Sequence, residues 1–568
     1  MRFLSKLRGI LTLLPKSAPL DKPLLAILTV VLLLGIYGSH WGRVESWHPD
    51  QMGFDDVFRE GHAPFNPARF RKPPFYIYTN LFLSTGPAGV AKRIGFPVAD
   101  VDAVRLVWSH TLNAFMFVGA CLALYFLIFH PFGLVTARVL VAIFGTSAGF
   151  LVFTHFLTPE IEVTLWMLVA FYFSFRILSR PDLRTYVLAG VFTGVATATK
   201  YNGLGIGISI VVAHLLVHRR NLLADWRRVI LSRNLYASLV SVVLAFIVCN
   251  PYAVLDYRTF AADFLYNYRV TPVFGGVADG TSYGEFLLLS TEIFGYPTAL
   301  FVLVSSLLSL YYLATRKLDL HHQNLLILIF VTFGVYYLQF GSFSFLQTRF
   351  TMPIYPLLLI TGGFLLRSLT PRSAYTLAAP FVLYGVVCSA HVGYRLSEDP
   401  RMHAQTWAMK NLRQNATMET TPYAPNFSKL KGSSISVTGS PTITGRTKFF
   451  APLFAGNAEM TQRMHELEGD RNLSWYSCDE FLRRRPDYVV IDSLYYQRFL
   501  DGTSERQIFP HITRHFEKLL NGGYPYRIVF DENMQPPPWW VYPQTIDFLE
   551  NRVTILESDD SQAADCGD

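Results

Sequence analysis

Charged side chains are scarce in this chain. Only 16% of its 568 residues are charged, whereas 51% are hydrophobic. A soluble protein carries about 25% charged residues. This shortage, together with many long apolar runs, excludes an ordinary soluble enzyme and indicates a polytopic membrane protein.

The chain also lacks the patterns of a metal, redox or nucleic-acid protein. Its five cysteines form no metal-binding or redox motif. Its net charge of +8 does not indicate a nucleic-acid partner, because the basic residues lie in short loops between apolar runs. Cys478 and Cys566 could pair if the C-terminal region is extracytoplasmic.

The apolar runs predict a bundle of membrane-spanning helices. A span needs roughly 20 apolar residues, and on this basis we expect about eleven spans. They lie at 24–37, 106–129, 137–153, 161–178, 186–199, 204–217, 235–249, 286–313, 325–340, 350–366 and 375–392.

The distribution of Lys and Arg predicts the orientation of these spans. The N-terminus and the loops 180–184, 219–233, 316–317 and 367–372 are basic, so we expect them on the cytoplasmic side. The acidic and motif-bearing loops, with everything after residue 392, then collect on the extracytoplasmic side. We expect a multi-pass protein of a bacterial inner membrane.

The hydropathy divides the chain into a membrane module and a smaller domain. Residues 1–395 form the transmembrane module, with large extracytoplasmic loops at 40–103 and 250–283. Residues 396–556 contain short β-rich runs at 488–491, 526–530 and 553–556, which predict an extracytoplasmic α/β domain. The acidic tail 557–568 is expected to be disordered.

The loop after the first span, residues 47–78, carries the strongest functional signal. It contains His48, Asp50 and Asp55 close to the membrane, followed by the basic residues Arg71 and Lys72. A carboxylate beside a membrane is costly unless it has a partner or a task. We interpret Asp50 as the base of a sugar transferase, although a lone Asp also suits a solvated loop.

Other charged residues are expected on the same face. These are Glu160, Lys200 and Arg349. Transfer of a sugar from a lipid phosphate needs a base for the acceptor proton and cations for the departing phosphate, but no strong acid. As alternatives, Glu160 could cap a helix, and Lys200 and Arg349 could be snorkelling side chains. Arg71 and Lys72 could contact lipid headgroups.

Six motifs in order resemble the polyprenyl-phosphate-dependent glycosyltransferases of the GT-C superfold, relatives of the protein O-mannosyltransferases and of the lipid A aminoarabinose transferase. They are WHPD (47–50), FNPARFRKPPFYIY (65–78), THFLTPE (154–160), TATKYNG (197–203), NPYAVLD (250–256) and RFTMPIYP (349–356). The resemblance extends over about residues 40–395. It implies an inverting transferase that uses a lipid-phosphate sugar on the extracytoplasmic face.

The resemblance also implies roles for single residues. Asp50 is similar to the catalytic acid of the first loop, and Glu160 to the acid of the second loop, with His155 as its neighbour. Lys200 resembles a phosphate-side cation, and Arg349 a basic residue near the lipid headgroup. The candidate substrate-binding residues are His48, Arg71, Lys72, His155, Lys200, Tyr201 and Arg349.

The chain departs from the family pattern at one position. Gln51 stands where the family usually has Glu after the Asp. If the second acid is essential, Asp55 or Asp56 could replace it. The predicted catalytic set is therefore Asp50, Asp55 and Glu160.

The expected partners are a polyprenyl-phosphate sugar, membrane lipids and a lipid, protein or polysaccharide acceptor, without nucleic acid. No cofactor is expected. A divalent metal could bind where Asp50 and Glu160 converge, since carboxylate oxygens suit Mg²⁺, Mn²⁺ or Ca²⁺. Two other functions remain open: a flippase of lipid-linked sugars, and a ligase that takes a whole glycan from a diphosphate carrier.

Overall fold

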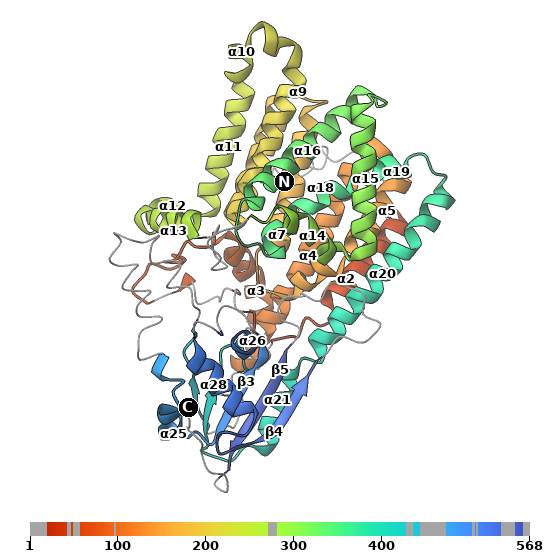
Figure 1. Cartoon of the computed structure of the whole chain (residues 1–568). Coiled ribbons are helices and arrows are strands. Elements are labelled where there is room, and N and C mark those ends of the chain that lie inside the picture. Colours follow the sequence, from red (N-terminus) through yellow and green to blue (C-terminus); the bar gives the residue numbers. More distant parts are fainter. Residues whose placement is uncertain are drawn as a thin grey trace.

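The computed structural model describes most of the chain. The described residues are 20–42, 47–48, 51, 57–58, 60–95, 98–270, 281–425, 427, 435–443, 473–501, 506, 509–534 and 551–559. They form a large helical module followed by a smaller α/β domain, which lies at the bottom of Figure 1. The predicted fold class is confirmed.

The helical module begins at α2 and ends with the long helix α20. Its α-helices are α2 (Lys22–Ile36), α3 (Phe75–Arg93), α4 (Val98–Phe132), α5 (Leu134–Gly145), α6 (Ala148–Leu151), α7 (Glu160–Ile177), α8 (Leu183–Thr199), α9 (Ile208–Ala224), α10 (Trp226–Ile230), α11 (Arg233–Cys249), α12 (Tyr252–Leu255), α13 (Tyr257–Val270), α14 (Tyr283–Phe294), α15 (Tyr296–Ala314), α16 (Leu320–Gly341), α17 (Thr348–Thr351), α18 (Tyr355–Leu359), α19 (Gly362–Leu366) and α20 (Pro371–Ser397). The 3-10 turns η2 (Val152–His155), η3 (Tyr201–Gly207) and η5 (Met352–Ile354) lie between them.

Polar caps mark where several apolar helices begin. The side chains of Asp21, Asp182, Asp319 and Thr370 each accept a hydrogen bond from a backbone N–H in the first turn of α2, α8, α16 or α20. Such a cap satisfies one of the N–H groups that the helix itself leaves without a partner.

Fewer helices than the roughly eleven predicted are long and apolar enough to be spans in the part of the chain that the structure describes. Among the described residues, seven helical stretches are long and apolar enough to cross a membrane, and an eighth results if Leu134–Gly145 and Ala148–His155, bent by 57°, count as one. The prediction of about eleven spans exceeds this number. The helices α2 and α8 have only 15 and 17 residues, and α7 carries two acids and an arginine in 18 residues.

One predicted span is broken into two helices. The run 286–313 is divided at Gly295, which ends α14 and begins α15 with φ +77°. Residues other than glycine rarely adopt this φ. A Cβ at position 295 would also lie 2.4 Å from the ring of Tyr384. The break therefore requires glycine for two reasons: the backbone conformation with positive φ, and the lack of a Cβ that would clash with Tyr384.

The C-terminal domain is built on a mixed sheet. Its helices are α21 (Pro400–Asn411), α25 (Cys478–Arg484), α26 (Ser493–Leu500) and α28 (Pro510–Leu520), and its strands are β1 (Thr417–Thr420), β2 (Ser436–Gly439), β3 (Tyr488–Asp492), β4 (Tyr526–Asn533) and β5 (Arg552–Ser558). The strand order is β2-β1-β3-β5-β4. Strands β1, β2 and β3 are parallel, and β5 runs antiparallel to β3 and β4.

The sheet has an apolar core on each face. One core joins α25, α26 and α28 to the sheet, and the other joins α21 to it. The three predicted strands correspond to β3, β4 and β5, and β5 continues two residues past the expected domain end at 556. Cys478 is disulfide-bonded. Cys566, with which the sequence allows it to pair, and the tail from residue 560 lie outside the described residues.

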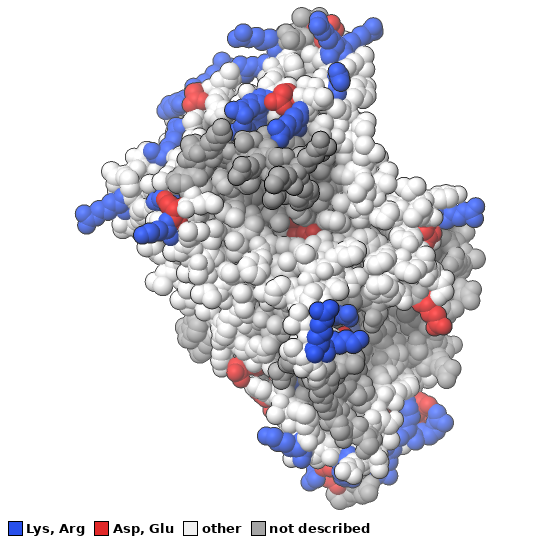
Figure 2. All heavy atoms as spheres, turned by 180° about the vertical axis from the view of Figure 1, so that it is seen from behind, with Lys and Arg blue, Asp and Glu red and all other residues white. Residues whose placement is uncertain are grey.

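The two parts are joined along α20. Figure 1 shows this helix running from the helical module toward the sheet, and α21 follows it after a short break. In Figure 2, Lys and Arg gather at the end of the module that carries α10, and a broad surface with few charged side chains follows. This pattern agrees with a membrane-embedded belt.

The segments predicted to share one face lie together in the structure. The side chain of Asn66 donates to Asp256 Oδ2 at 3.1 Å, and Tyr252 donates to the carbonyl of Pro64 at 2.7 Å. Both contacts join the first loop to the segment after α11. The hydrogen bonds from Asn66 and Thr259 outweigh burial and hold the pKa of Asp256 below its ordinary value.

Candidate functional site

Glu160 is the first residue of α7. Pro159 precedes it at the N-cap, and proline is suited to helix starts because it has no N–H to leave unsatisfied. The helix dipole favours a carboxylate at this end. Glu160 is nevertheless only 3% exposed, so it needs a more direct partner than the dipole.

Lys200 supplies that partner. It is the extended residue between α8 and η3, and its Nζ donates to Glu160 Oε1 at 2.9 Å and to the carbonyl of Arg349 at 2.8 Å. The structure therefore brings together the second-loop acid and the predicted phosphate-side cation, which come from different motifs.

Arg349 completes this group of charges. It lies in the short helix α17, where Gln347 accepts from its Nε at 2.8 Å, and its guanidinium carbon lies 5.7 Å from the ring centre of Phe350. The positive charge of Arg349 attracts the carboxylate of Glu160. The positive charges of Arg349 and Lys72 repel the Lys200 ammonium. We call Glu160, Lys200, Arg349 and Lys72 the charge cluster.

The cluster has more positive than negative charges. Glu160 is its one acid, and the other three members are cations. A site of this composition can hold an anion with a developing negative charge. The pair formed by Glu160 and Lys200 also satisfies the buried acid, which would otherwise be costly to bury.

A second buried carboxylate, Glu162, was expected on the same face as Glu160 and lies beside the cluster. Glu162 Oε1 accepts from Thr79 Oγ1 at 3.2 Å and from Trp166 Nε1 at 3.1 Å. Its Oε2 and the hydroxyl of Tyr76 are buried, and neither has a hydrogen-bond partner among the described residues. The Glu-x-Glu spacing at the start of α7 is the sequence signal for this residue.

The basic part of the first loop is held by α13. The guanidinium carbon of Arg71 lies 4.0 Å from the ring centre of Tyr266, and its Nε lies 3.9 Å from Asp263 Oδ1. The Phe70 N–H donates to Asp263, and Tyr201 donates its hydroxyl proton to the Phe70 carbonyl at 2.7 Å. Arg71 and Tyr201 therefore have structural partners, and the hydrogen bond of Tyr201 ties the loop to the segment that carries Lys200.

The two predicted histidines are both buried. His155 Nε2 lies 2.9 Å from the Tyr37 carbonyl, and its Nδ1 lies 3.0 Å from the Leu151 carbonyl. These contacts favour a structural role for His155 and do not test its contact with substrate. The His48 ring lies 4.5 Å from that of Phe156, in the turn that leads to Glu160.

Two members of the predicted catalytic set, Asp50 and Asp55, lie outside the described residues. Within the described parts of the chain, no three His, Cys, Asp or Glu side chains are grouped so as to hold a metal ion. A metal that involves Asp50 therefore stays a prediction.

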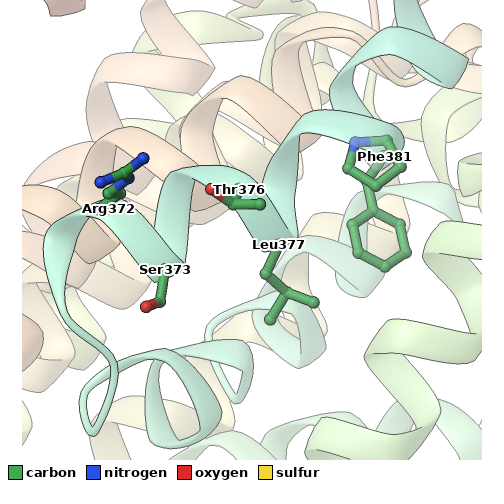
Figure 3. Close-up of a pocket in the computed structure, with 6 residues that line it drawn as sticks. Arg372, Ser373, Thr376, Leu377 and Phe381 are labelled. Atoms are coloured by element: carbon green, nitrogen blue, oxygen red, sulfur yellow. The ribbon is translucent and has the colours of Figure 1, made fainter.

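An open pocket elsewhere does not belong to this site. It is lined by Arg372, Ser373, Thr376, Leu377, Pro380 and Phe381. All six residues lie on α20, and Figure 3 labels five of them on this helix. A groove along one apolar helix is what a lipid-facing surface presents, and it contains no acid.

Comparison with known proteins gives one family match. Residues 104–254 match the family model of the dolichyl-phosphate-mannose-protein mannosyltransferases. This segment contains Glu160, Lys200 and the motif around residue 250. No curated protein sequence matches the chain.

Several solved structures are similar to the chain at low identity. ArnT from Cupriavidus metallidurans bound to undecaprenyl phosphate has 13% identity and a TM-score of 0.48, and the alignment covers 94% of this chain and 97% of that one. The oligosaccharyltransferase of Archaeoglobus fulgidus has 14% identity and a TM-score of 0.42, with 84% and 69% covered. The arabinofuranosyltransferase AftD from Mycobacteria has 12% identity and a TM-score of 0.42, with 98% and 41% covered.

The family match falls on the part of the chain that supplies the buried acid and its lysine. Over residues 104–254, the chain is therefore similar to the dolichyl-phosphate-mannose-protein mannosyltransferases.

Proposed function

We propose that the protein transfers a sugar, with inversion, from a polyprenyl-phosphate carrier to an acceptor hydroxyl on the extracytoplasmic face of a bacterial inner membrane. The observation that carries the proposal is the buried pair of Glu160 and Lys200 beside Arg349. The matched family is named for a dolichyl-phosphate-linked sugar, and dolichyl phosphate is a polyprenyl phosphate. The acceptor is a lipid, a protein or a polysaccharide.

The proposed reaction needs one proton acceptor and several cations. The carboxylate of Asp50 takes the proton of the acceptor hydroxyl, whose oxygen attacks the anomeric carbon. The bond between that carbon and the phosphate oxygen breaks, and its electron pair leaves with the lipid phosphate. Lys200, Arg349 and Lys72 stabilise the charge that develops on this phosphate.

Glu160 has a supporting part in this scheme. Its carboxylate holds the Lys200 ammonium in place and favours its charged form in a buried setting. The phosphate then approaches a cation whose position is already set. Such preorganisation is most useful when the charge grows only in the transition state.

Lys200→Gln tests the role of the cations. We expect transfer to fall by about 10²- to 10³-fold, the size found for loss of one transition-state donor. The assay is transfer from a radiolabelled polyprenyl-phosphate sugar in proteoliposomes. The matched control is Lys317→Gln: Lys317 lies in the loop between α15 and α16, at the end of the module away from the C-terminal domain (Figure 1). Equal activity of the two variants would contradict the proposal.

Asp50→Asn tests the proposed base. The amide cannot accept the acceptor proton, so we expect transfer to be abolished while the protein still elutes as a folded monodisperse species. Full activity of this variant in membranes would remove Asp50 from the mechanism without excluding a role for Lys200.

A transporter of lipid-linked sugars is the second candidate function. The bend of 57° between α5 and the segment from α6 to η2 favours it, since broken helices are typical of transporters. Vesicles loaded with a labelled lipid-linked sugar separate the two. A transporter moves the label without breaking the sugar–phosphate bond, whereas a transferase forms a new product. Mass spectrometry of the product then distinguishes one transferred sugar from the whole glycan that a diphosphate-dependent ligase would move.

A further inference from the structure

A buried group of residues joins the C-terminal domain to two parts of the helical module, the first loop and the turn before α7. Trp41 and Trp47 belong to the first loop, Phe156 to the turn before α7, and Asp399 and Arg401 to the start of α21. We call these five residues the Trp–Arg junction. Asp399 and Arg401 are 1% and 0% exposed, although both are charged.

Asp399 and Arg401 form a two-bonded ion pair. Arg401 donates from Nε to Asp399 Oδ1 at 2.9 Å and from its terminal nitrogen to Oδ2 at 2.7 Å. The Trp41 indole N–H donates to the same Oδ2 at 2.8 Å. The guanidinium carbon lies 4.8 Å from the ring centre of Trp47 and 5.3 Å from that of Trp41. The planar guanidinium is thus oriented by the carboxylate and faces both indoles.

The aromatic rings continue from this pair to the turn before α7. Trp41 and Trp47 meet edge to face, with ring centres 5.6 Å apart. The Trp41 ring also lies 5.3 Å from that of Phe156, and Phe156 lies 4.5 Å from His48. Phe156 belongs to the turn that ends at Glu160. Arg401 is therefore connected through ring contacts to the loop that follows α2 and to the turn that presents the buried acid.

A fully buried ion pair is a poor way to gain stability. Removing both charges from water costs several kcal/mol, and apolar residues of the same size often stabilise as well or better. Directed bonds do set orientation, because the fork of the guanidinium matches one arrangement of carboxylate and rings. The buried ion pair is therefore better explained by its orienting effect: it fixes the position of the first loop relative to the turn before α7, rather than stabilising the domain.

We propose that Arg401, held by Asp399, is a positioning residue for the transfer reaction. It fixes the first loop and the turn before Glu160 against the C-terminal domain, so that turnover depends on a domain outside the matched family segment. This inference rests on the proposed function. It predicts a loss of turnover with little change in donor affinity, because Arg401 contacts neither Lys200 nor Arg349 in its ion pair and ring contacts.

The C-terminal domain offers a matched control. Arg484 forms the same kind of pair with Glu419, at 2.6 Å and 3.2 Å, and its guanidinium carbon lies 3.8 Å from the ring centre of Trp475. This pair and its ring lie within the domain. Arg484→Lys therefore removes a stacked, two-bonded arginine without touching either loop.

The experiment compares Arg401→Lys with Arg484→Lys in the full-length protein in proteoliposomes. For Arg401→Lys we expect kcat to fall by about 10- to 100-fold, the scale of a small misplacement of reacting groups. The donor KM should stay within about twofold of the wild type, since the phosphate contacts are intact. Arg484→Lys should keep both constants within about twofold. Equal losses in both variants, or a rise in KM alone, would overturn the inference.

Hydrogen–deuterium exchange supplies a readout that does not require activity. We expect Arg401→Lys to speed exchange in peptides that contain Trp41 and Thr158, and Arg484→Lys to leave both unchanged. If the wild type transfers no sugar at all, the proposed function fails and this exchange alone decides the positioning role. Unchanged exchange in Arg401→Lys would overturn it.

Asp399→Asn covers the case in which Arg401→Lys does not fold. Its amide oxygen still accepts from Trp41, but it no longer carries the charge that orients Arg401. If kcat of Asp399→Asn falls by less than is expected for Arg401→Lys, with faster exchange in the same peptides, the inference is supported. If Asp399→Asn keeps the wild-type kcat and the wild-type exchange, the inference is contradicted.

Discussion

At the scale of single residues, burial decides what an ionisable group does. Glu160 and Lys200 lie in different motifs, yet each is the other's partner at 2.9 Å. Removing one member of a buried pair costs about 3–5 kcal/mol, because the remaining charge stays buried without compensation. A loss of stability must therefore be measured beside any loss of transfer in variants of this pair.

Asp492 shows the same effect in the C-terminal domain. It is 0% exposed at the end of β3, and burial raises its pKa to about 7 against the opposing charge of Arg401. The unfolded chain loses this proton near pH 4, whereas the folded chain keeps it until about pH 7. Asp492 therefore stabilises the fold fully below about pH 4, and this contribution is lost as the pH rises to about 7.

Asp492→Asn should remove this pH dependence. We expect the difference in unfolding free energy between pH 5 and pH 8 to shrink by roughly 2–4 kcal/mol, from about 1.4 kcal/mol per pKa unit. Thermal unfolding at several pH values measures it. The exposed Asp501 in the same domain is the control position, and Asp501→Asn should follow the wild type. Parallel profiles for Asp492→Asn and the wild type would show that Asp492 does not titrate as described.

At the scale of elements, breaks in apolar helices determine which residues face the interior. The break between α14 and α15 occurs at Gly295, and that between α17 and α18 contains Pro353 in η5. Hydropathy sums over a window and does not register either break. The proline was a visible signal, whereas Gly295 needed its positive φ and the contact with Tyr384 to be understood.

Gly295→Ala should destabilise the helical module. The new Cβ would meet the Tyr384 ring at 2.4 Å and would require a strained φ, so we expect a loss of roughly 1–3 kcal/mol. Thermal unfolding in detergent measures this loss. Gly334→Ala in α16 is the control, because a Cβ there meets nothing within 4 Å and alanine favours a helix. Equal midpoints for the two variants would contradict this account of the break.

At the scale of the whole molecule, the charge distribution predicts the orientation in the membrane. The loop after α15 and the end of α10 carry basic side chains, and the C-terminal domain lies at the other end of the helical module (Figure 1). From the positive-inside rule we expect the C-terminal domain outside the cytoplasm.

Cysteine labelling tests this orientation. We expect Lys410→Cys, at an exposed position of α21, to react in intact spheroplasts with a membrane-impermeant maleimide above the wild-type background. Lys317→Cys should react only after permeabilisation. The reverse pattern would invert the topology and would place the charge cluster on the cytoplasmic face.

The amino-acid sequence alone determined the class of the protein and the candidate residues of its site. Long apolar runs must be helical in lipid, because only then are their backbone polar groups satisfied. The strands at 488, 526 and 553 were likewise visible, since their β-rich runs lie between turns. The order of the motifs also identified Glu160, Lys200 and Arg349 as candidates for one site.

Only the tertiary structure decided which charges are partners and which elements hold them. Trp41 and Asp399 are separated by 358 positions, and no local pattern in either segment names the other. Their contact exists because α2 and α20 pack together, with Gly38 against Gly393, and bring the first loop to the start of α21. Hydropathy reports how apolar a segment is, but the shape of side chains at such close approaches determines which segments meet.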